Sequence, residues 1–341
     1  MMASEHLPVV RPARADDGDA LLAMARAAGP GMTSLPADAA TLAAMLATSA
    51  ARMEAGDAPA GNGALWFILW RGGEAIGACA IFPAVGTGWP FYSYRRDKVR
   101  AVSQALGRSI TLETLSPSNH FDGVAEVGGL IVLPAERGGG AGRIAARSRY
   151  LFLAEHRGWF PDRVMAELRG HQDADGVSPV WEALGRPFYA MDFDAADAFG
   201  ARHGNQFIAE LGPRFPIYAD LLSPAARAAL GRPHAQSRPA YDMLLAEGFR
   251  DDGYIDIFDG GPQVSAEIDD LAAVRDCRIE TLVATDAMPD ETAALLSVGR
   301  GLGFRSTRGG VARRDGGIAI DAVAVERLGA CVGDRVRWVA F

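Results

Sequence analysis

Cysteine is scarce in this chain, and the spacings that hold a metal are missing. Three cysteines occur among 341 residues, an odd number that indicates no disulfide framework and fits a reducing compartment. The six histidines include no His-x-x-x-His pair, which argues against a zinc site. We therefore expect no bound metal and a core held together by apolar burial alone.

Long hydrophobic runs are missing as well. The longest strongly apolar run, residues 64–70, is far shorter than the roughly 20 residues that span a bilayer. Charged Arg11, Arg14, Asp16 and Asp17 interrupt the N-terminal stretch, so we expect no signal peptide. The expected location is the cytoplasm, without membrane association.

An excess of basic charge is the third absence. Lysine and arginine number 34 against 42 aspartates and glutamates, which gives a net charge of −8. A nucleic-acid-binding protein needs a basic face to neutralise phosphates, so this balance argues against nucleic acid as a partner. Hydrophobic residues make up 49% and charged residues 22%, which is typical of a globular chain long enough for two domains.

The chain does contain alternating strand and helix patterns. Apolar runs predict strands, and a periodicity near 3.6 residues predicts helices. The expected strands cover residues 8–12, 65–70, 75–82, 125–133, 163–168 and 188–193, and helices are expected at 21–25, 37–53, 144–155 and 180–184. This order predicts an α+β fold with a mixed sheet flanked by helices.

The most informative stretch covers residues 130–143. An apolar segment stops at Pro134, and a turn containing Arg137-x-x-Gly140-x-Gly142 leads into the next expected helix. A helix start leaves about four backbone N–H groups without partners, and glycines let a large anion approach them. The turn therefore predicts a diphosphate-binding site. A plain strand–turn–helix connection, which glycines also suit, is the alternative.

This order of strand, proline, Arg-x-x-Gly-x-Gly and helix resembles the coenzyme A pyrophosphate loop of the GNAT acyltransferases. Nearly end to end, the chain is similar to the arginine N-succinyltransferase family. The most specific matching segments are residues 166–170 (Ala-Glu-Leu-Arg-Gly) and residues 255–262 (Ile-Asp-Ile-Phe-Asp-Gly-Gly-Pro). The resemblance implies a GNAT-like fold and transfer of a succinyl group from succinyl-CoA to the α-amino group of arginine. Succinyl-CoA is then a co-substrate, and no permanently bound cofactor is expected.

A weak internal repeat suggests how the domains are arranged. A proline-initiated helix with an aromatic residue on its first turn, followed by an expected strand, occurs at residues 178–193 and again at 238–258. We expect residues 1–196 to form a GNAT-like acyl-CoA-binding domain. Residues 197–341 are expected to form a second, degenerate GNAT-like domain that contributes the catalytic histidine and ends in a short β-rich tail.

The resemblance implies how coenzyme A is held. The backbone of the strand before the loop, at Leu130 and Val132, is expected to pair with pantetheine as a peptide adds to a sheet edge. The preceding glycine pair, residues 128–129, permits a bulge there. Arg147, one turn into the helix, is expected to be solvated. The diphosphate loop is expected to comprise Arg137, Gly138, Gly139, Gly140, Ala141, Gly142 and Arg143.

Acyl transfer to an amine needs a base for the amine, a donor for the oxyanion and an acid for the leaving thiolate. Many GNAT relatives use a tyrosine after the loop as the acid, but that position here is Trp181, which has no suitable proton. The resemblance places the proton donor on His234, and a loop histidine that caps the next helix is the alternative. Glu126 is a candidate base or an exposed strand-end carboxylate. The backbone N–H near Leu130 is the candidate oxyanion donor.

For substrate recognition, the resemblance gives only candidate residues, which lie in the matching segments. Arginine needs a carboxylate for its guanidinium group and a cationic or amide partner for its α-carboxylate, and the succinyl group adds another carboxylate. The candidates are Arg95, Ser118, Asn119, Glu167 and Arg169.

Two alternatives to this function stay open. In the first alternative, the acceptor is ornithine or another amine, or the chain is one subunit of an arginine/ornithine succinyltransferase hetero-oligomer. A homo-oligomer is also compatible with the sequence. The other alternative is a catalytically inactive coenzyme-sensing or scaffold protein, against which the complete glycine loop and His234 argue.

Overall fold

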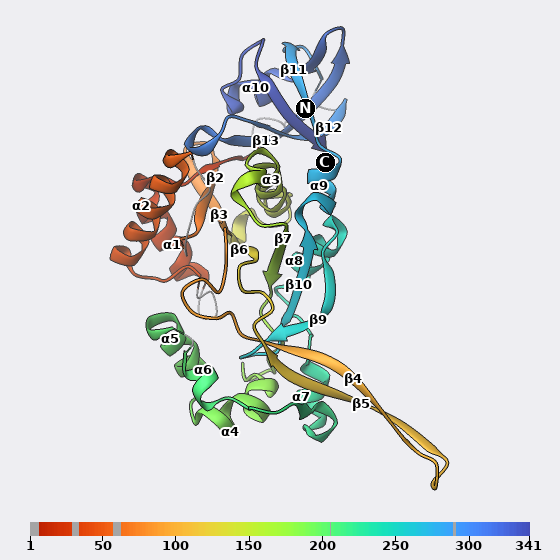
Figure 1. The fold of residues 1–341 in the computed structure, drawn as a ribbon. Coiled ribbons are helices and arrows are strands. Elements are labelled where there is room, and N and C mark those ends of the chain that lie inside the picture. The colour runs from red at the N-terminus through yellow and green to blue at the C-terminus, as the bar shows by residue number, and fades with distance from the viewer. Residues whose placement is uncertain (1–6, 29–33, 57–62, 205, 289–290) are drawn as a thin grey trace. The chain divides into compact units, whose positions relative to one another are not determined.

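The computed structural model describes residues 7–28, 34–56, 63–204, 206–288 and 291–341 (Figure 1). The chain forms two compact units. Unit 1 joins residues 1–83, 127–162 and 267–341, and unit 2 joins residues 84–126 and 163–266. The expected ranges 1–196 and 197–341 are therefore not the compact units. Whether they are two copies of one ancestral unit is a separate question and stays a prediction.

Two helices and a hairpin form the N-terminal part of unit 1. The elements are β1 (Val9–Pro12), a 3₁₀ turn (Ala15–Asp17), α1 (Gly18–Ala28), α2 (Ala39–Ala55), β2 (Leu65–Arg71) and β3 (Glu74–Phe82). α2 begins after Asp38, whose carboxylate accepts the N–H of Thr41 at 2.8 Å. The apolar faces of both helices pack on Trp66 and Ile68 of β2. The expected helix at 37–53 and the hairpin of 65–70 with 75–82 are confirmed.

The C-terminal segment of unit 1 forms a small barrel. Its elements are α9 (Ala272–Arg275), β11 (Arg278–Ala284), β12 (Thr292–Val298), a 3₁₀ turn (Gly301–Gly303), β13 (Arg305–Arg314), β14 (Gly317–Ile320), α10 (Ala322–Leu328) and β15 (Arg335–Ala340). The strands pair in the order β12–β15–β11–β14–β13, and β13 also pairs with β12, which closes the ring. β13 divides its other edge between β14 and β1. The β-rich tail was expected, but α10 within it was not.

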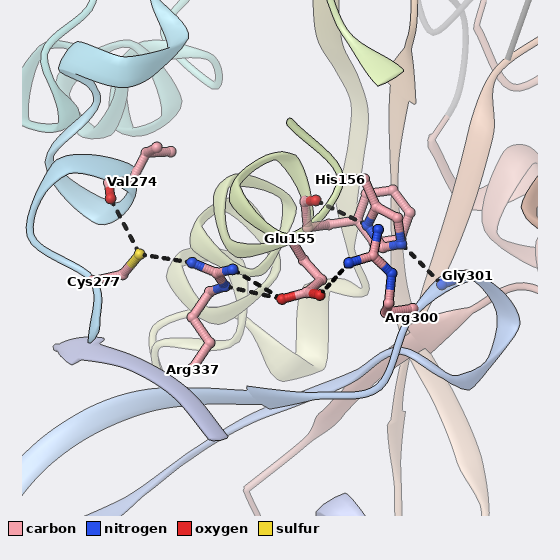
Figure 2. A network of polar contacts seen from close by, with 8 residues as sticks. Glu155, His156, Val274, Cys277, Arg300, Gly301 and Arg337 are labelled. Carbon is pink, nitrogen blue, oxygen red and sulfur yellow. Dashed lines mark hydrogen bonds and ion pairs between the residues drawn. The ribbon is translucent and has the colours of Figure 1, made fainter. Parts of the chain in front are cut away.

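α3 (Ala141–Glu155) is a largely buried helix of unit 1 that packs against β3, β12 and β13. At its C-terminal end, the Glu155 carboxylate forms ion pairs with Arg300 at 2.7 Å and with Arg337 of β15 at 2.9 Å (Figure 2). The adjacent His156 ring contacts the carbonyl of Phe152 through Nδ1 at 3.1 Å, and its Nε2 accepts the N–H of Gly301 at 3.0 Å. These contacts fix the helix from the end opposite to the glycine loop.

Unit 2 is built on a sheet that begins with the first residues of β6. Its strand order is β6–β7–β10–β9–β4–β5–β8. The strands are β4 (Ser93–Ser103), β5 (Arg108–Ser118), β6 (Ala125–Val132), β7 (Arg163–Glu167), β8 (Ile217–Tyr218), β9 (Arg250–Asp256) and β10 (Pro262–Glu267). β6 pairs in parallel with β7 through Ala125↔Val164 and Glu126↔Met165, and the division between the units follows directly after Glu126.

Short helices complete unit 2 and enclose a second core. They are a π-helical turn (Trp181–Gly185), α4 (Arg186–Tyr189), α5 (Phe193–His203), α6 (Gln206–Leu211), a 3₁₀ turn (Ala219–Leu221), α7 (Pro224–Ala229) and α8 (Arg238–Glu247). Unit 1 has further 3₁₀ turns at Pro134–Glu136, Arg157–Trp159 and Ile268–Asp270. Trp181 is fully buried in this core, and its ring stacks on Tyr189 with centroids 5.6 Å apart. The indole N–H donates to the carbonyl of Met191 at 3.0 Å. Trp181 is therefore a packing residue.

The expected strand at residues 188–193 is wrong. Residues 186–189 are helical, Ala190 ends that helix with a φ of 52°, and α5 begins at Phe193. Burial of Tyr189 against Trp181 favours helix here, although the aromatic pattern favours strand. The second repeat does have its helix and strand, α8 and β9. The first copy of the internal repeat therefore lacks the strand that the second copy has.

Candidate active site

The glycine loop connects β6 to α3, as the sequence predicts. Gly138 and Gly140 both have a φ of 85°, a left-handed conformation that glycine adopts without strain. A Cβ atom added at Gly138, Gly139 or Gly140 would meet no atom within 4 Å. No side chain caps α3, whose N-cap residue is Gly140. The loop thus presents an open face beside uncapped helix N–H groups, the arrangement that binds a diphosphate.

One of the three arginines around the loop differs from the expectation. Arg137 is exposed, and its Nε donates to the carbonyl of Val132 at 3.0 Å. The Arg143 guanidinium lies 4.5 Å from the ring centroid of Phe341. Arg147 was expected to be solvated, but it is buried and its Nη1 donates to the carbonyl of Ala340 at 2.8 Å. Arg147 therefore connects α3 to the end of β15, while Arg137 and Arg143 lie at the loop.

β6 carries the glycine pair that the sequence singles out. Gly129 has a φ of 58°, and an added Cβ would lie 2.8 Å from the Trp66 ring. The sequence reasoning missed Arg149 of α3, which is buried and donates through Nη1 to the carbonyls of Gly128 at 3.0 Å and Ala80 at 3.3 Å. A buried guanidinium thus fixes the bend in the strand that holds Leu130. The sequence signal for Arg149 is a charged residue on the face of the helix that is otherwise apolar.

His234 lies on the loop before α8 in unit 2. Its N–H donates to the carbonyl of Arg169 at 2.8 Å, and its Nδ1 accepts the N–H of Gln236 at 3.2 Å. Because Nδ1 accepts, the neutral ring carries its proton on Nε2. Burial, and after it the positive charge of Arg169, lower the pKa of His234, which favours the neutral ring.

Asp259 holds the backbone beneath this loop. Its carboxylate accepts the N–H of Gly170 at 2.6 Å and the N–H of Gly261 at 2.8 Å. Asp256 accepts the N–H groups of Phe258 and Asp259. Burial raises the pKa of both carboxyls, and the negative charge of Glu167 raises that of Asp256 further. The two aspartates therefore shape a turn that supports the Arg169–Gly170 backbone, to which His234 is bonded.

A row of polar side chains crosses four neighbouring strands of unit 2. Glu167 of β7 accepts from Nε2 of Gln263 on β10 at 2.6 Å. Gln263 pairs with Tyr254 of β9, and Tyr254 pairs with Arg95 of β4, so the three side chains share one face. Gln263 is 1% exposed, and its Oε1 has no hydrogen-bond partner among the described residues. We call Glu167, Gln263, Tyr254 and Arg95 the polar row.

The remaining substrate candidates lie at the end of β5, which is Ser118, and on the loop that follows it. The Ser118 hydroxyl accepts the N–H of His120 at 3.2 Å, and Nδ2 of Asn119 donates to Asp122 at 2.9 Å. His120 Nδ1 lies 2.8 Å from the Tyr254 hydroxyl, and Nη1 of Arg95 donates to that hydroxyl at 3.4 Å. Tyr254 thus brings together Arg95 and the loop of Ser118 and Asn119. The sequence reasoning missed Tyr254 and Gln263, because only strand register aligns them with Glu167.

The predicted site residues divide between the two units. Leu130, Val132 and residues 137–143 lie in unit 1, whereas Glu126, Arg95, Ser118, Asn119, Glu167, Arg169 and His234 lie in unit 2. In the part of the chain that the structure describes, no group of three His, Cys, Asp or Glu side chains is placed to hold a metal ion. No described helix is long and apolar enough to cross a membrane.

Comparison with known proteins decides the family. Residues 8–273 match the model of the arginine N-succinyltransferase beta subunit, and residues 275–340 match the model of its C-terminal domain. The chain belongs to the arginine N-succinyltransferase beta subunit family. The second match covers nearly all of the barrel formed by β11–β15.

Relatives of this arginine N-succinyltransferase family chain match it over nearly its full length. It is 36% identical over 332 residues to arginine N-succinyltransferase subunit beta of Pseudomonas aeruginosa, covering 97% of each chain. It is 38% identical over 336 residues to arginine N-succinyltransferase of Salmonella paratyphi B, again covering 97% of each. The solved arginine/ornithine succinyltransferase subunit AI from Pseudomonas aeruginosa has 30% identity and a TM-score of 0.86, covering 98% of this chain and 99% of that one. The predicted family and α+β fold are confirmed.

Proposed function

We propose that this chain transfers the succinyl group of succinyl-CoA to the α-amino group of L-arginine, giving N2-succinyl-L-arginine and coenzyme A. The observation that carries the proposal is membership of the arginine N-succinyltransferase family across both matched domains. The open glycine loop at the uncapped start of α3 supports it, since the diphosphate of succinyl-CoA needs unpartnered N–H groups.

The acyl donor is assigned to the loop and the strand before it. Gly138 to Arg143 hold the diphosphate, and the backbone of Leu130 and Val132 pairs with pantetheine. The carbonyl oxygen of Val132 has one lone pair left for an amide N–H of pantetheine, because the Arg137 side chain donates to the other. Succinyl-CoA enters as a co-substrate, and nothing remains bound after coenzyme A leaves.

The chemistry is a direct attack of the amine on the thioester. The α-ammonium group first loses a proton, a step that we assign to Glu126. Nitrogen then bonds to the thioester carbon, the oxyanion accepts the backbone N–H near Leu130, and the carbon–sulfur bond breaks. The second proton of the attacking nitrogen then passes to the departing sulfur by way of His234: the neutral ring takes it up, the imidazolium gives its Nε2 proton to the thiolate, and the ring returns to the neutral form. Glu126 releases the first proton to solvent.

The acceptor is assigned to the polar row and its neighbours. The guanidinium group of arginine donates to the Glu167 carboxylate and to the unpartnered Oε1 of Gln263. Arg95 and the amide of Asn119 face the carboxylate end of a substrate, and Ser118 and Arg169 complete the candidate set. Because ornithine presents an ammonium group instead of a planar guanidinium, this pair of acceptors favours arginine.

Ornithine remains the second candidate acceptor, because the structural relative is described as an arginine/ornithine succinyltransferase subunit. The relatives' names also indicate a subunit of an oligomer. The expected cytoplasmic location rests on the free cysteines among the described residues.

The direct test is thiol release by the purified chain. We expect succinyl-CoA with arginine to release coenzyme A several-fold faster than succinyl-CoA with ornithine or acetyl-CoA with arginine. Faster release with ornithine would reverse the acceptor assignment. No release above background with any amine, although the chain binds succinyl-CoA, would favour a coenzyme-sensing protein.

Acceptor binding has its own test at Glu167. We expect Glu167→Gln to raise KM for arginine by roughly 10- to 100-fold, because a charge-assisted hydrogen bond contributes about 1.5–3 kcal/mol. KM for succinyl-CoA should stay unchanged, and Glu210→Gln, at an exposed glutamate of α6 in the same unit, serves as the matched control. An unchanged KM for arginine would remove Glu167 from the site.

A further inference from the structure

Unit 2 carries a long two-stranded arm that the sequence did not predict. β4 and β5 stay paired from Ser93↔Ser118 out to Ser103↔Arg108, a ladder of eleven cross-strand pairs. The ribbon extends beyond the rest of unit 2 (Figure 1). We call residues 93–118 the arm.

One face of the arm is apolar near its outer end. Opposite residues of an antiparallel pair lie on the same face, and so do residues two positions apart. Val99↔Leu112 and Ala101↔Ile110 therefore form one continuous strip. Val99 is 42% exposed and Ile110 is 53% exposed, and Leu106 at the turn is 73% exposed.

Such a strip is unusual for a free surface. A two-stranded hairpin is at best marginally stable in water, and packing against an apolar partner stabilises it. Contiguous exposed apolar surface on a globular protein marks an interaction site. The apolar strip of the outer arm therefore has the character of an interaction surface that a partner buries.

A second apolar surface lies beside the base of the same arm. The segment of residues 211–221 exposes Leu211, Phe215, Tyr218 and Leu221, of which Phe215 is 80% and Leu221 82% exposed. This segment contains β8, which pairs with the inner part of β5 through Thr114↔Tyr218. We call these four side chains the β8 patch.

Charge indicates what covers the arm. The arm has five basic residues and two acidic ones, a net charge of +3. The whole chain has a net charge of −8, so the residues outside the arm carry −11. The net charge of a second copy therefore attracts the arm, whereas two arms side by side repel each other. The β8 patch of that copy supplies an exposed apolar surface for the strip.

We propose that the arm docks on a second copy of this chain, with the arm tip of each copy seated on the β8 patch of the other. The exchange is reciprocal, because both surfaces belong to every copy. A two-fold axis satisfies that condition, since the same surface then serves on both subunits. The proposal concerns assembly and does not depend on the substrate.

The first test is the mass of the full-length chain in solution, by light scattering or sedimentation. We expect the wild type to have twice its 36.0 kDa chain mass. Leu106→Asp combined with Ile110→Asp should give a monomer, because charge on the strip disfavours burial. Val332→Asp, at a position 61% exposed in unit 1, is the matched control and should stay dimeric. A monomeric wild type, or a dimeric arm variant, would overturn the proposal.

The second test locates the contact and does not depend on how the aspartate variant folds. Leu106→Cys combined with Leu221→Cys should form a disulfide-linked dimer under mild oxidation, since linkage requires Cα atoms within about 7 Å. Leu106→Cys alone controls for linkage to the exposed Cys331. A dimer that gives no more linked species than this control would overturn the seating on the β8 patch.

Discussion

At the scale of single residues, the three consecutive glycines of the loop, Gly138, Gly139 and Gly140, have separable functions. Gly138 and Gly140 need the left-handed conformation, so any side chain there strains the backbone. Gly139 has an ordinary φ and open space around an added Cβ. A substitution at Gly139 therefore tests the approach of a ligand without changing the shape of the loop.

We expect Gly139→Asp to raise KM for succinyl-CoA about 10-fold or more, because a carboxylate beside the diphosphate adds repulsion of a few kcal/mol at short range. Initial rates at varied succinyl-CoA measure it. Gly158→Asp, at another glycine with an ordinary φ and open space, is the control and should leave KM unchanged. An equal KM for both variants would make the loop a plain connection.

We expect His234→Ala to lower kcat by roughly 10²–10⁴-fold, the range for a lost acid or base, with little change in KM for either substrate. Steady-state kinetics measure both constants. Glu210→Ala, at an exposed residue of α6 in the same unit, is the control and should keep kcat within several-fold. A near wild-type kcat for His234→Ala would leave the ring only its contacts with Gln236 and Arg169.

At the scale of elements, α3 joins the loop at one end to a buried histidine at the other. His156 is 2% exposed, and burial lowers its pKa to about 4. In the unfolded chain the ring titrates near its ordinary value of ~6.5. Between pH 6.5 and 4, the unfolded chain therefore takes up a proton that the folded chain does not, and stability falls as the pH falls through this window.

Removing this titration should flatten the pH dependence of stability. We expect the wild type to lose on the order of 2–3 kcal/mol from His156 between pH 7 and pH 4. In His156→Gln, whose amide can replace both hydrogen bonds, that loss should be absent. Denaturant unfolding at a series of pH values measures the difference. Equal slopes in wild type and His156→Gln would contradict the expectation.

Elements also show where sequence patterns succeed and fail. β2, β3 and α2 have strong apolar periodicity and lie where predicted. The arm was not predicted, because its outer strands mix charged and apolar residues with no buried face to impose a clear alternation. Residues 188–193 were predicted as a strand from their apolar run, but packing of Tyr189 on Trp181 stabilises helix there.

At the scale of the whole molecule, unit 1 is assembled from three separate stretches of chain. β1 pairs with β13 of the barrel, and the end of α3 is bonded to Arg337 of β15. The N-terminal stretch therefore lacks part of its sheet until the last residues are present. Contacts this distant in sequence make folding slow and cooperative.

We expect a chain shortened to residues 1–274 to lose cooperative thermal unfolding, because β1 loses one of its two partner strands and α3 loses the barrel that packs on it. Circular dichroism during heating and limited proteolysis measure this against the full chain. A shortened chain that unfolds cooperatively within a few degrees of the full chain would show that residues 1–274 fold independently.

The sequence by itself determined the glycine loop, the family and the α+β class, because these depend on local turn chemistry and on long matching segments. It identified His234 and Glu167 as candidates, while the alignment of Glu167 with Gln263, Tyr254 and Arg95 depends on strand register. The division into units and the apolar face of the arm also came only from tertiary structure. Pairing between distant segments decides which side chains share a face, and that information is not local to any stretch of sequence.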